Sequence, residues 1–265
     1  MILREHASSP FHGPALCLGV PDFYLTRREL RRALGQDESG ADDTEVPATE
    51  FFAAIGIRDI TSVDIPGSVH APDLIHDLNQ PLPPELLDRF GLLVDPGTME
   101  HVFDVRAGLT NVVRALAVGG TVIHFVPIYS YNGGYFSINP NVMHDFYTVN
   151  GFADVRSFIV MYDRYRPFGG RSRVYQYGPT MEARHALADG DQVRYSPHLL
   201  FFARKTRAVS EIAIPIQHEP EPSARRRVAG VWLRRMFGAA LTTYVAGHVL
   251  RALQLRRSRR KSFWI

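Results

Sequence analysis

Three carboxylates stand where short apolar or β-branched runs of the sequence end. Asp64 ends the run ITSVD, Asp77 follows LIH, and Asp95 ends the apolar run FGLLVD. In open α/β sheets, ligands bind in the crevice beyond the carboxyl ends of the strands, where an acidic side chain can accept both hydroxyls of a ribose. A single aspartate in such a place more often caps a turn or a helix. Three at successive strand ends favour a nucleotide-like ligand.

The elements that position these carboxylates follow from the hydrophobic pattern. Strands are predicted at 15–19, 60–65, 74–76, 90–95, 121–126, 155–161 and 198–203, a short helical turn at 84–89, and helices at 25–34, 49–55, 99–117 and 139–149. Thr26 and Glu29 have the spacing of a capping box, and Gly119-Gly120 is expected to end the third helix. The alternation predicts a doubly wound, Rossmann-like α/β sheet that is mostly parallel, with an antiparallel last strand.

The stretch from Asp88 to Val126, DRFGLLVDPGTMEHVFDVRAGLTNVVRALAVGGTVIHFV, carries the most specific pattern. A strand with a polar loop at its end is followed by EHV at a helix start, then LxxGG and the next strand. This order resembles the class I S-adenosylmethionine-dependent methyltransferases, and the resemblance covers roughly residues 15–203.

The resemblance implies S-adenosylmethionine as cofactor and assigns positions to it. Asp64 would contact the ribose, Asp77 would lie on the adenine side, and the loop 95–100 would line the rest of the site. The cofactor-binding residues predicted in this way are Gly19, Asp64, Asp77, Asp95, Gly97 and Thr98.

The chain departs from the family after the first strand. The family has a G-x-G-x-G loop there, whose glycines let the backbone approach the methionine part of the cofactor. This chain has Leu18-Gly19-Val20-Pro21-Asp22-Phe23, in which Gly19 alone remains and Pro21 lacks a backbone donor. The cofactor therefore sits differently, binds more weakly, or is not bound.

Methyl transfer to a hydroxyl is helped by a base. His101 is the predicted base, because histidine titrates near neutral pH, with Glu100 or Asp95 orienting it. The alternative is that His101 caps its helix. His124 lies within an apolar strand and is interpreted as a core histidine with satisfied hydrogen bonds. Asp95, Glu100 and His101 do not have a spacing diagnostic of a metal site, and no metal is predicted.

The acceptor is expected at the loop after the strand 121–126, which reads PIYSYNGGYFSINPNVMHDFY. The predicted substrate-binding residues are Tyr131, Tyr135, Phe136 and His144; sealing of the core is the alternative for such aromatics. The predicted reaction is O-methylation of a glycan, a glycolipid or a small metabolite. The altered glycine loop keeps open a second interpretation, a methyltransferase-like binding or scaffold protein without activity.

Charge divides the chain. Residues 223–265 hold ten Arg, one Lys and no Asp or Glu, which makes +11; because the whole chain carries +3, residues 1–222 carry −8. A lead-in (1–12), a methyltransferase-like domain (13–207), a linker (208–222) and a partly apolar helical tail (223–265) are predicted. The tail resembles an interfacial anchor for an anionic membrane surface, with packing on the body or a partner, or a disordered end, as alternatives.

Other bulk features narrow the function classes. The single cysteine, Cys17, cannot form an internal disulfide, and the sequence shows no signal peptide or membrane-spanning run, so a cytoplasmic protein is predicted. The acidic body argues against nucleic acid as a partner.

The insertion 162–197 holds five Tyr and six Arg, which suits a lid over the site or an interface in a homodimer.

Overall fold

The structure is a computed structural model that describes residues 1–22, 25–68, 71–129, 133–163, 172–177, 195–216 and 262–264. Its elements in chain order are α1 (Ile2–Ser8), β1 (Ala15–Leu18), α2 (Arg27–Ala33), α3 (Ala48–Ala54), β2 (Ile60–Asp64), β3 (Leu74–Ile75), the 3-10 turn η1 (Pro84–Leu86), β4 (Phe90–Asp95), the 3-10 turn η2 (Met99–His101), α4 (Val105–Ala115), β5 (Leu116–Pro127), α5 (Pro140–Val149), β6 (Phe152–Asp163), β7 (Arg173–Tyr177), β8 (Tyr195–Lys205) and β9 (Ser262–Trp264).

The chain divides into two compact units, Met1–Val155 with His198–Ile214, and Arg156–Pro197 with Pro215–Ile265. The sheet of the first unit has the strand order β3-β2-β1-β4-β5-β8. Neighbours from β3 to β5 are parallel, and β8 runs antiparallel to β5. The order reverses between β1 and β4, as in a doubly wound sheet. The predicted fold class, including its antiparallel last strand, is therefore confirmed.

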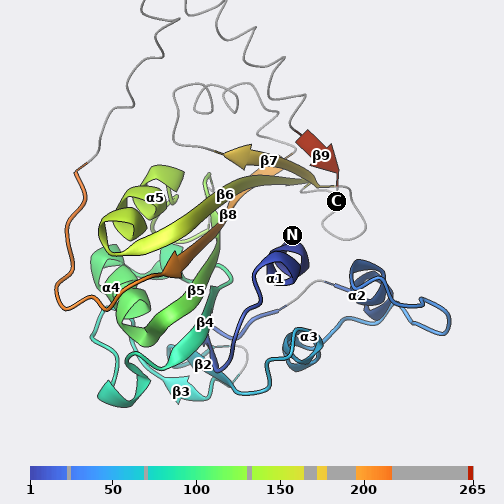
Figure 1. The fold of residues 1–265 in the computed structure, drawn as a ribbon, viewed down its shortest axis with the longest axis horizontal. Coiled ribbons are helices and arrows are strands. Elements are labelled where there is room, and N and C mark those ends of the chain that lie inside the picture. The colour runs from blue at the N-terminus through green and yellow to red at the C-terminus, as the bar shows by residue number, and fades with distance from the viewer. Residues whose placement is uncertain are drawn as a thin grey trace, which may run out of the picture. The chain divides into compact units, whose positions relative to one another are not determined.

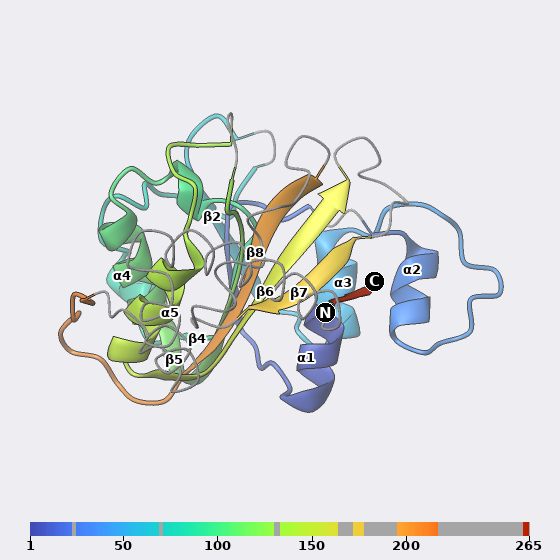
Figure 2. The ribbon, with the colours of Figure 1, turned by 90° about the horizontal axis from the view of Figure 1, so that it is seen from above.

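Helices cover both faces of this sheet. Helices α4 and α5 lie on one face, and α1 and α3 lie on the other (Figures 1 and 2). The central strands are consequently buried: all four residues of β1 are inaccessible, as are Leu92 and Leu93 of β4. Cys17 lies in the middle of β1, between the parallel partners β2 and β4, and burial raises the pKa of its thiol to about 12. Such near-continuous apolar strands are expected where helices cover both faces of a parallel sheet.

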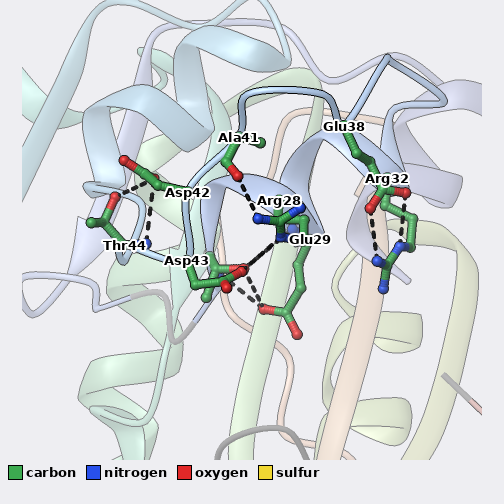
Figure 3. Close-up of polar contacts among 9 residues, drawn as sticks. Arg28, Glu29, Arg32, Glu38, Ala41, Asp42, Asp43 and Thr44 are labelled. Carbon is green, nitrogen blue, oxygen red and sulfur yellow. Dashed lines mark hydrogen bonds and ion pairs between the residues drawn. The ribbon is translucent and has the colours of Figure 1, made fainter.

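Helix α2 begins at the predicted capping box. The Thr26 hydroxyl accepts the Glu29 N–H at 3.2 Å, and the Glu29 carboxylate accepts the Thr26 N–H at 3.0 Å. The acidic loop 36–45 folds back on the helix, where Arg28 pairs with Asp43 at 2.9 Å and Arg32 with Glu38 at 2.7 Å (Figure 3). These contacts give the acidic loop a defined place beside α2.

The predicted helix 99–117 is wrong in its extent. Met99–His101 is a separate 3-10 turn, and α4 begins after Asp104, whose carboxylate accepts the Ala107 N–H at 3.0 Å. The helix ends before the predicted stop, since Gly119 and Gly120 lie inside β5. A register shift in the β4–β5 pairing falls at the same level, between Phe90 and Leu92, so the glycines accommodate an irregularity in the sheet.

The second unit contains an antiparallel set, in which β7 pairs with β6 and β9 pairs with β7. The sequence predicts neither β7, which lies in the insertion 162–197, nor β9, which lies in the tail. The helical tail predicted over 223–265 falls outside the described residues, except for 262–264, which form β9. Among the helices that the structure describes, none has the length and apolar character needed to cross a membrane.

Candidate functional site

The carboxyl ends of β2 and β4 reach the same edge of the sheet because both strands run parallel to β1. At the end of β2, Asp64 is partly exposed, and its Oδ1 accepts the backbone N–H of Ile65 at 2.8 Å. The next side chain, Ile65, is 56% exposed. A carboxylate beside an exposed apolar side chain suits a ligand that has hydroxyl groups next to a planar apolar ring.

Asp77 follows β3 and caps a turn, as the more ordinary interpretation of such an aspartate predicts. Its Oδ1 accepts the backbone N–H of Asn79 at 2.9 Å and the side-chain amide of Asn79 at 2.6 Å. These hydrogen bonds hold the pKa of the exposed carboxyl below its ordinary value. The Asn79 side chain in turn accepts the Asp104 N–H at 2.8 Å, so the turn after β3 is tied to the start of α4.

Asp95, at the end of β4, has no exposed surface. Its Oδ1 accepts the N–H groups of Gly97, Thr98 and Met99 at 3.3, 2.8 and 3.2 Å. Its Oδ2 lies 2.6 Å from His124 Nδ1. Asp95 thus holds the turn 97–99 in place, and the direct cofactor contact expected for it stays a prediction.

His124 and Tyr147 continue this buried arrangement. The Tyr147 hydroxyl lies 2.6 Å from His124 Nε2, and both side chains are inaccessible. The interpretation of His124 as a satisfied core histidine is confirmed, but the sequence did not identify its partners. The β4–β5 register places Asp95 directly opposite His124, so pairing the two predicted strands in register would have revealed the contact. Burial, reinforced by the Asp95 charge, raises the pKa of Tyr147 well above its ordinary value.

Thr98 and Gly19 join β4 and β1 at the carboxyl ends of these two strands. The Thr98 hydroxyl donates to the carbonyl of Leu18 at 2.7 Å. Gly19 has a φ of +79°, and a Cβ at this position would lie 2.7 Å from Thr98 Oγ1. Only glycine satisfies both the backbone conformation and this close approach. Gly19, the remaining glycine of the altered loop, therefore leaves room for the Thr98 hydroxyl, which lies where a side chain at position 19 would begin.

Glu100 is a further buried ionisable group beside Asp95, with 5% of its surface exposed. Its Oε2 is buried and has no hydrogen-bond partner among the residues that the structure describes. Burial, and to a smaller extent the charge of Asp95, raises the pKa of its carboxyl to about 8. At neutral pH the carboxyl therefore holds a proton that it can donate, and it becomes a proton acceptor above about pH 8.

The loop 133–136 packs on Glu100. The Glu100 carbonyl accepts the N–H groups of Tyr135 and Phe136 at 2.8 and 3.2 Å. Gly134 has a φ of +110°, and a Cβ there would lie 2.7 Å from that carbonyl oxygen and 2.9 Å from Glu100 Cγ. On the other side, a Cβ on Gly97 would lie 3.3 Å from Glu100 Oε1. Glycines on two loops thus make room for one buried carboxyl.

The predicted base His101 is exposed, and its backbone N–H donates to the Thr98 carbonyl at 2.9 Å. Both oxygens of Asp95 are engaged by the turn and by His124. The orientation of His101 by Asp95 or Glu100 stays a prediction. Among the described residues, no group of three or more His, Cys, Asp and Glu side chains could hold a metal ion.

Two of the predicted acceptor residues, Tyr135 and Phe136, lie beside the backbone of Glu100 and are exposed. Tyr131 falls outside the described residues. His144 lies on α5, where its Nδ1 is 3.2 Å from Asp145 Oδ1, and the contacts found for it do not join it to the loop 133–136. The structure therefore brings together Gly19, Gly97, Thr98 and Glu100, with Tyr135 and Phe136 beside them.

No family model and no curated protein matches the chain in sequence. Among solved structures, the chain resembles an S-adenosylmethionine-dependent methyltransferase from Thermotoga maritima, with 13% identity over 77% of this chain and 87% of that one, at a TM-score of 0.40. It also resembles phosphoethanolamine N-methyltransferase 2 of Haemonchus contortus, solved with S-adenosyl-L-methionine (11% identity, 78% and 52% coverage, TM-score 0.42), and a branched-chain polyamine synthase from Thermus thermophilus (16% identity, 77% and 54% coverage, TM-score 0.36). At these identities and scores, a function for this chain has to be argued from its own residues.

Proposed function

We propose that the protein is an S-adenosylmethionine-dependent methyltransferase. The observation that carries the proposal is the edge of the sheet where the strand order reverses, because ligands of doubly wound sheets bind at such a point. Asp64 offers a carboxylate to ribose hydroxyls there, and the exposed Ile65 offers an apolar surface to an adenine ring. The cofactor, when bound, supplies an electrophilic methyl group on sulfur.

The acceptor in this proposal is a hydroxyl on a glycan, a glycolipid or a small metabolite. In the transfer, the acceptor oxygen forms a bond to the methyl carbon, the carbon–sulfur bond breaks, and the hydroxyl proton passes to a base. Glu100 suits this role better than His101, because it is buried in the turn after β4 and its Oε2 lacks a hydrogen-bond partner among the described residues. With its pKa near 8, transfer is expected to accelerate as pH rises towards that value.

Calorimetric titration with S-adenosylmethionine and S-adenosylhomocysteine tests the cofactor. Saturable binding of either is expected, and Asp64→Ala should weaken it by about ten- to a hundredfold, since a hydrogen bond to a charged group contributes about 1.5–3 kcal/mol. Asp43→Ala is the matched control, because Asp43 is an exposed carboxylate that pairs with Arg28 in the loop 36–45. An absence of binding for both compounds at millimolar concentration would overturn the proposal.

A second candidate, binding of the cofactor without transfer, is favoured by the Thr98 hydroxyl above Gly19 and by the buried Pro21. Both side chains reduce the space in which the methionine part of the cofactor would lie. Titration with adenosine separates the two: a transferase should bind S-adenosylmethionine much more tightly than adenosine, whereas a site closed at its methionine end should bind both alike.

We further propose that residues 223–265 attach the protein to anionic membrane surfaces, on the evidence of their +11 charge and apolar residues. Sedimentation with phosphatidylserine vesicles tests this proposal. Binding that falls with added salt and disappears when 223–265 are deleted supports it, and equal sedimentation of the full and shortened chains contradicts it.

A further inference from the structure

Three exposed aromatic side chains gather beside Glu100. Phe103, Tyr135 and Phe136 are 71%, 68% and 39% exposed, although large apolar side chains usually avoid such exposure. The Phe103 ring lies 5.5 Å from that of Tyr135 and 6.2 Å from that of Phe136, between centroids. The three rings, which we call the aromatic face, come from two loops, 102–104 and 133–137.

The aromatic face is joined to Glu100 through the backbone. Phe103 follows η2, the turn that contains Glu100, and the N–H groups of Tyr135 and Phe136 both donate to the Glu100 carbonyl. The aromatic face therefore adjoins the backbone of a residue that is only 5% exposed and whose carboxyl Oε2 has no partner among the described residues. A buried polar atom without a partner is costly, so a ligand that supplies its hydrogen bond gains affinity.

We propose that Phe103, Tyr135, Phe136 and Glu100 form a subsite for an uncharged pyranose ring, stacked on the aromatic face with one hydroxyl towards the Glu100 carboxyl. The inference rests on the proposed function for its role in catalysis, because that hydroxyl would be the one methylated. Sugar binding itself, however, requires neither the cofactor nor methyl transfer. Phe103, which the sequence did not single out, supplies the most exposed ring of the subsite.

The chemistry of the subsite favours an uncharged sugar over charged ligands. An anionic group would meet Glu100 and the nearby charge of Asp95, which already disfavours a second negative charge at Glu100. A cage for a cationic amine has aromatic walls that surround the ligand, whereas these rings contact one another, with Phe103 and Tyr135 edge to face at 88°. Aliphatic C–H groups of a pyranose suit such a packed face, and its hydroxyls suit a carboxyl that holds a proton.

Saturation-transfer NMR with the full-length protein and no cofactor tests the subsite. The probes are the methyl glycosides of glucose, galactose and mannose, with glucosamine and glucuronate as charged counterparts, each at millimolar concentration. Transfer to the ring C–H protons of at least one methyl glycoside is expected. Phe103→Ala with Tyr135→Ala should weaken its binding about tenfold, which corresponds to roughly 1.4 kcal/mol of aromatic contact.

Val118→Ala is the matched control, because Val118 is exposed but lies near the amino end of β5, away from the loop that follows this strand. It should leave the NMR signals unchanged, and thermal melts of all variants verify folding. Signals from none of the methyl glycosides, stronger signals from glucosamine or glucuronate, or equal binding by the aromatic variants would overturn the subsite. Sugar binding by a protein that binds no S-adenosylmethionine would retain the subsite and reject the proposed function instead.

Discussion

Polar contacts of similar length occur in two regions of the first unit that differ in burial. Beside α2, Arg28 pairs with Asp43 at 2.9 Å and Arg32 with Glu38 at 2.7 Å, with all four side chains at least a third exposed (Figure 3). At the end of β4, Asp95 lies 2.6 Å from His124, and neither side chain is accessible. The length of a contact therefore does not show how much that contact contributes to stability. Water can replace a lost partner beside α2, whereas the buried region offers no substitute.

The largest effect is expected from Asp95→Ala. The substitution removes the acceptor of three backbone N–H groups and of His124 while leaving these donors buried. We expect the free energy of unfolding to fall by about 4 kcal/mol. Urea denaturation followed by circular dichroism measures it, with Asp43→Ala as the exposed control. Equal losses of unfolding free energy in Asp95→Ala and Asp43→Ala would show that burial does not make the contacts at the end of β4 more important than those beside α2.

Lys205→Met should have the next largest effect. Lys205 is 1% exposed, and its Nζ donates to Asp88 Oδ1 at 2.8 Å and to the carbonyls of Val113 and Leu116 at 2.8 and 2.5 Å, where α4 ends. The substitution leaves two carbonyls without their donor, so a loss of about 3 kcal/mol is expected in the same denaturation experiment.

Asp88→Asn distinguishes the two kinds of contact that Lys205 makes, the ion pair with Asp88 and the hydrogen bonds to the backbone carbonyls. The Asp88 side chain is 71% exposed, and the lysine keeps both carbonyl contacts when the carboxylate is removed. A clearly smaller loss than that of Lys205→Met is expected. A larger loss would mean that Lys205 stabilises the protein mainly through its ion pair with Asp88, and less through its hydrogen bonds to the carbonyls at the end of α4.

Glu100→Gln tests the buried carboxyl through pH. The folded protein holds the Glu100 proton up to about pH 8, whereas the unfolded chain releases it near 4.5, so the free energy of unfolding falls as pH rises between these values. Between pH 6 and 9 we expect the wild type to lose about 3 kcal/mol that the variant keeps. Thermal melts across this range measure the difference, with the exposed Glu85→Gln as control. Parallel pH profiles of the wild type and Glu100→Gln would contradict the raised pKa.

The smallest effect is expected from Arg32→Ala. The Arg32 guanidinium and the Glu38 carboxylate face solvent, so water and salt replace their contact readily. We expect no measurable change in melting temperature in the presence or absence of added salt. A marked loss that salt abolishes would show that the contacts beside α2 act as a network.

The sequence predicted the fold best where local and tertiary preferences agree. The strands β1, β2 and β4 and the capping box at Thr26 lie where hydrophobic pattern and capping chemistry place them. The helix predicted over 99–117 failed because Asp95, at the end of a strand, holds the turn 97–99 and Asp104 begins the helix anew. Both contacts depend on side-chain geometry that periodicity does not encode.

The contacts of the candidate site residues depend on tertiary packing that the sequence did not reveal. The sequence pointed to the carboxylates at strand ends and to the loop 95–100. In the structure, however, Asp95 is buried against His124, and Glu100 is buried whereas His101 is exposed. Burial of Glu100 depends on Gly134, which is distant in sequence and packs its backbone on the Glu100 carbonyl. No local pattern around Glu100 contains that information.

The single cysteine, Cys17, can report how often the central sheet opens in the native protein. Cys17 is inaccessible in the central strand β1, and a thiol with a pKa of about 12 is almost entirely protonated at neutral pH. A thiol-reactive reagent can modify it only when β1 separates from its neighbours, since the thiolate is the reactive form and needs access. The rate of labelling therefore reports how often the centre of the sheet opens in the native protein, without any introduced dye.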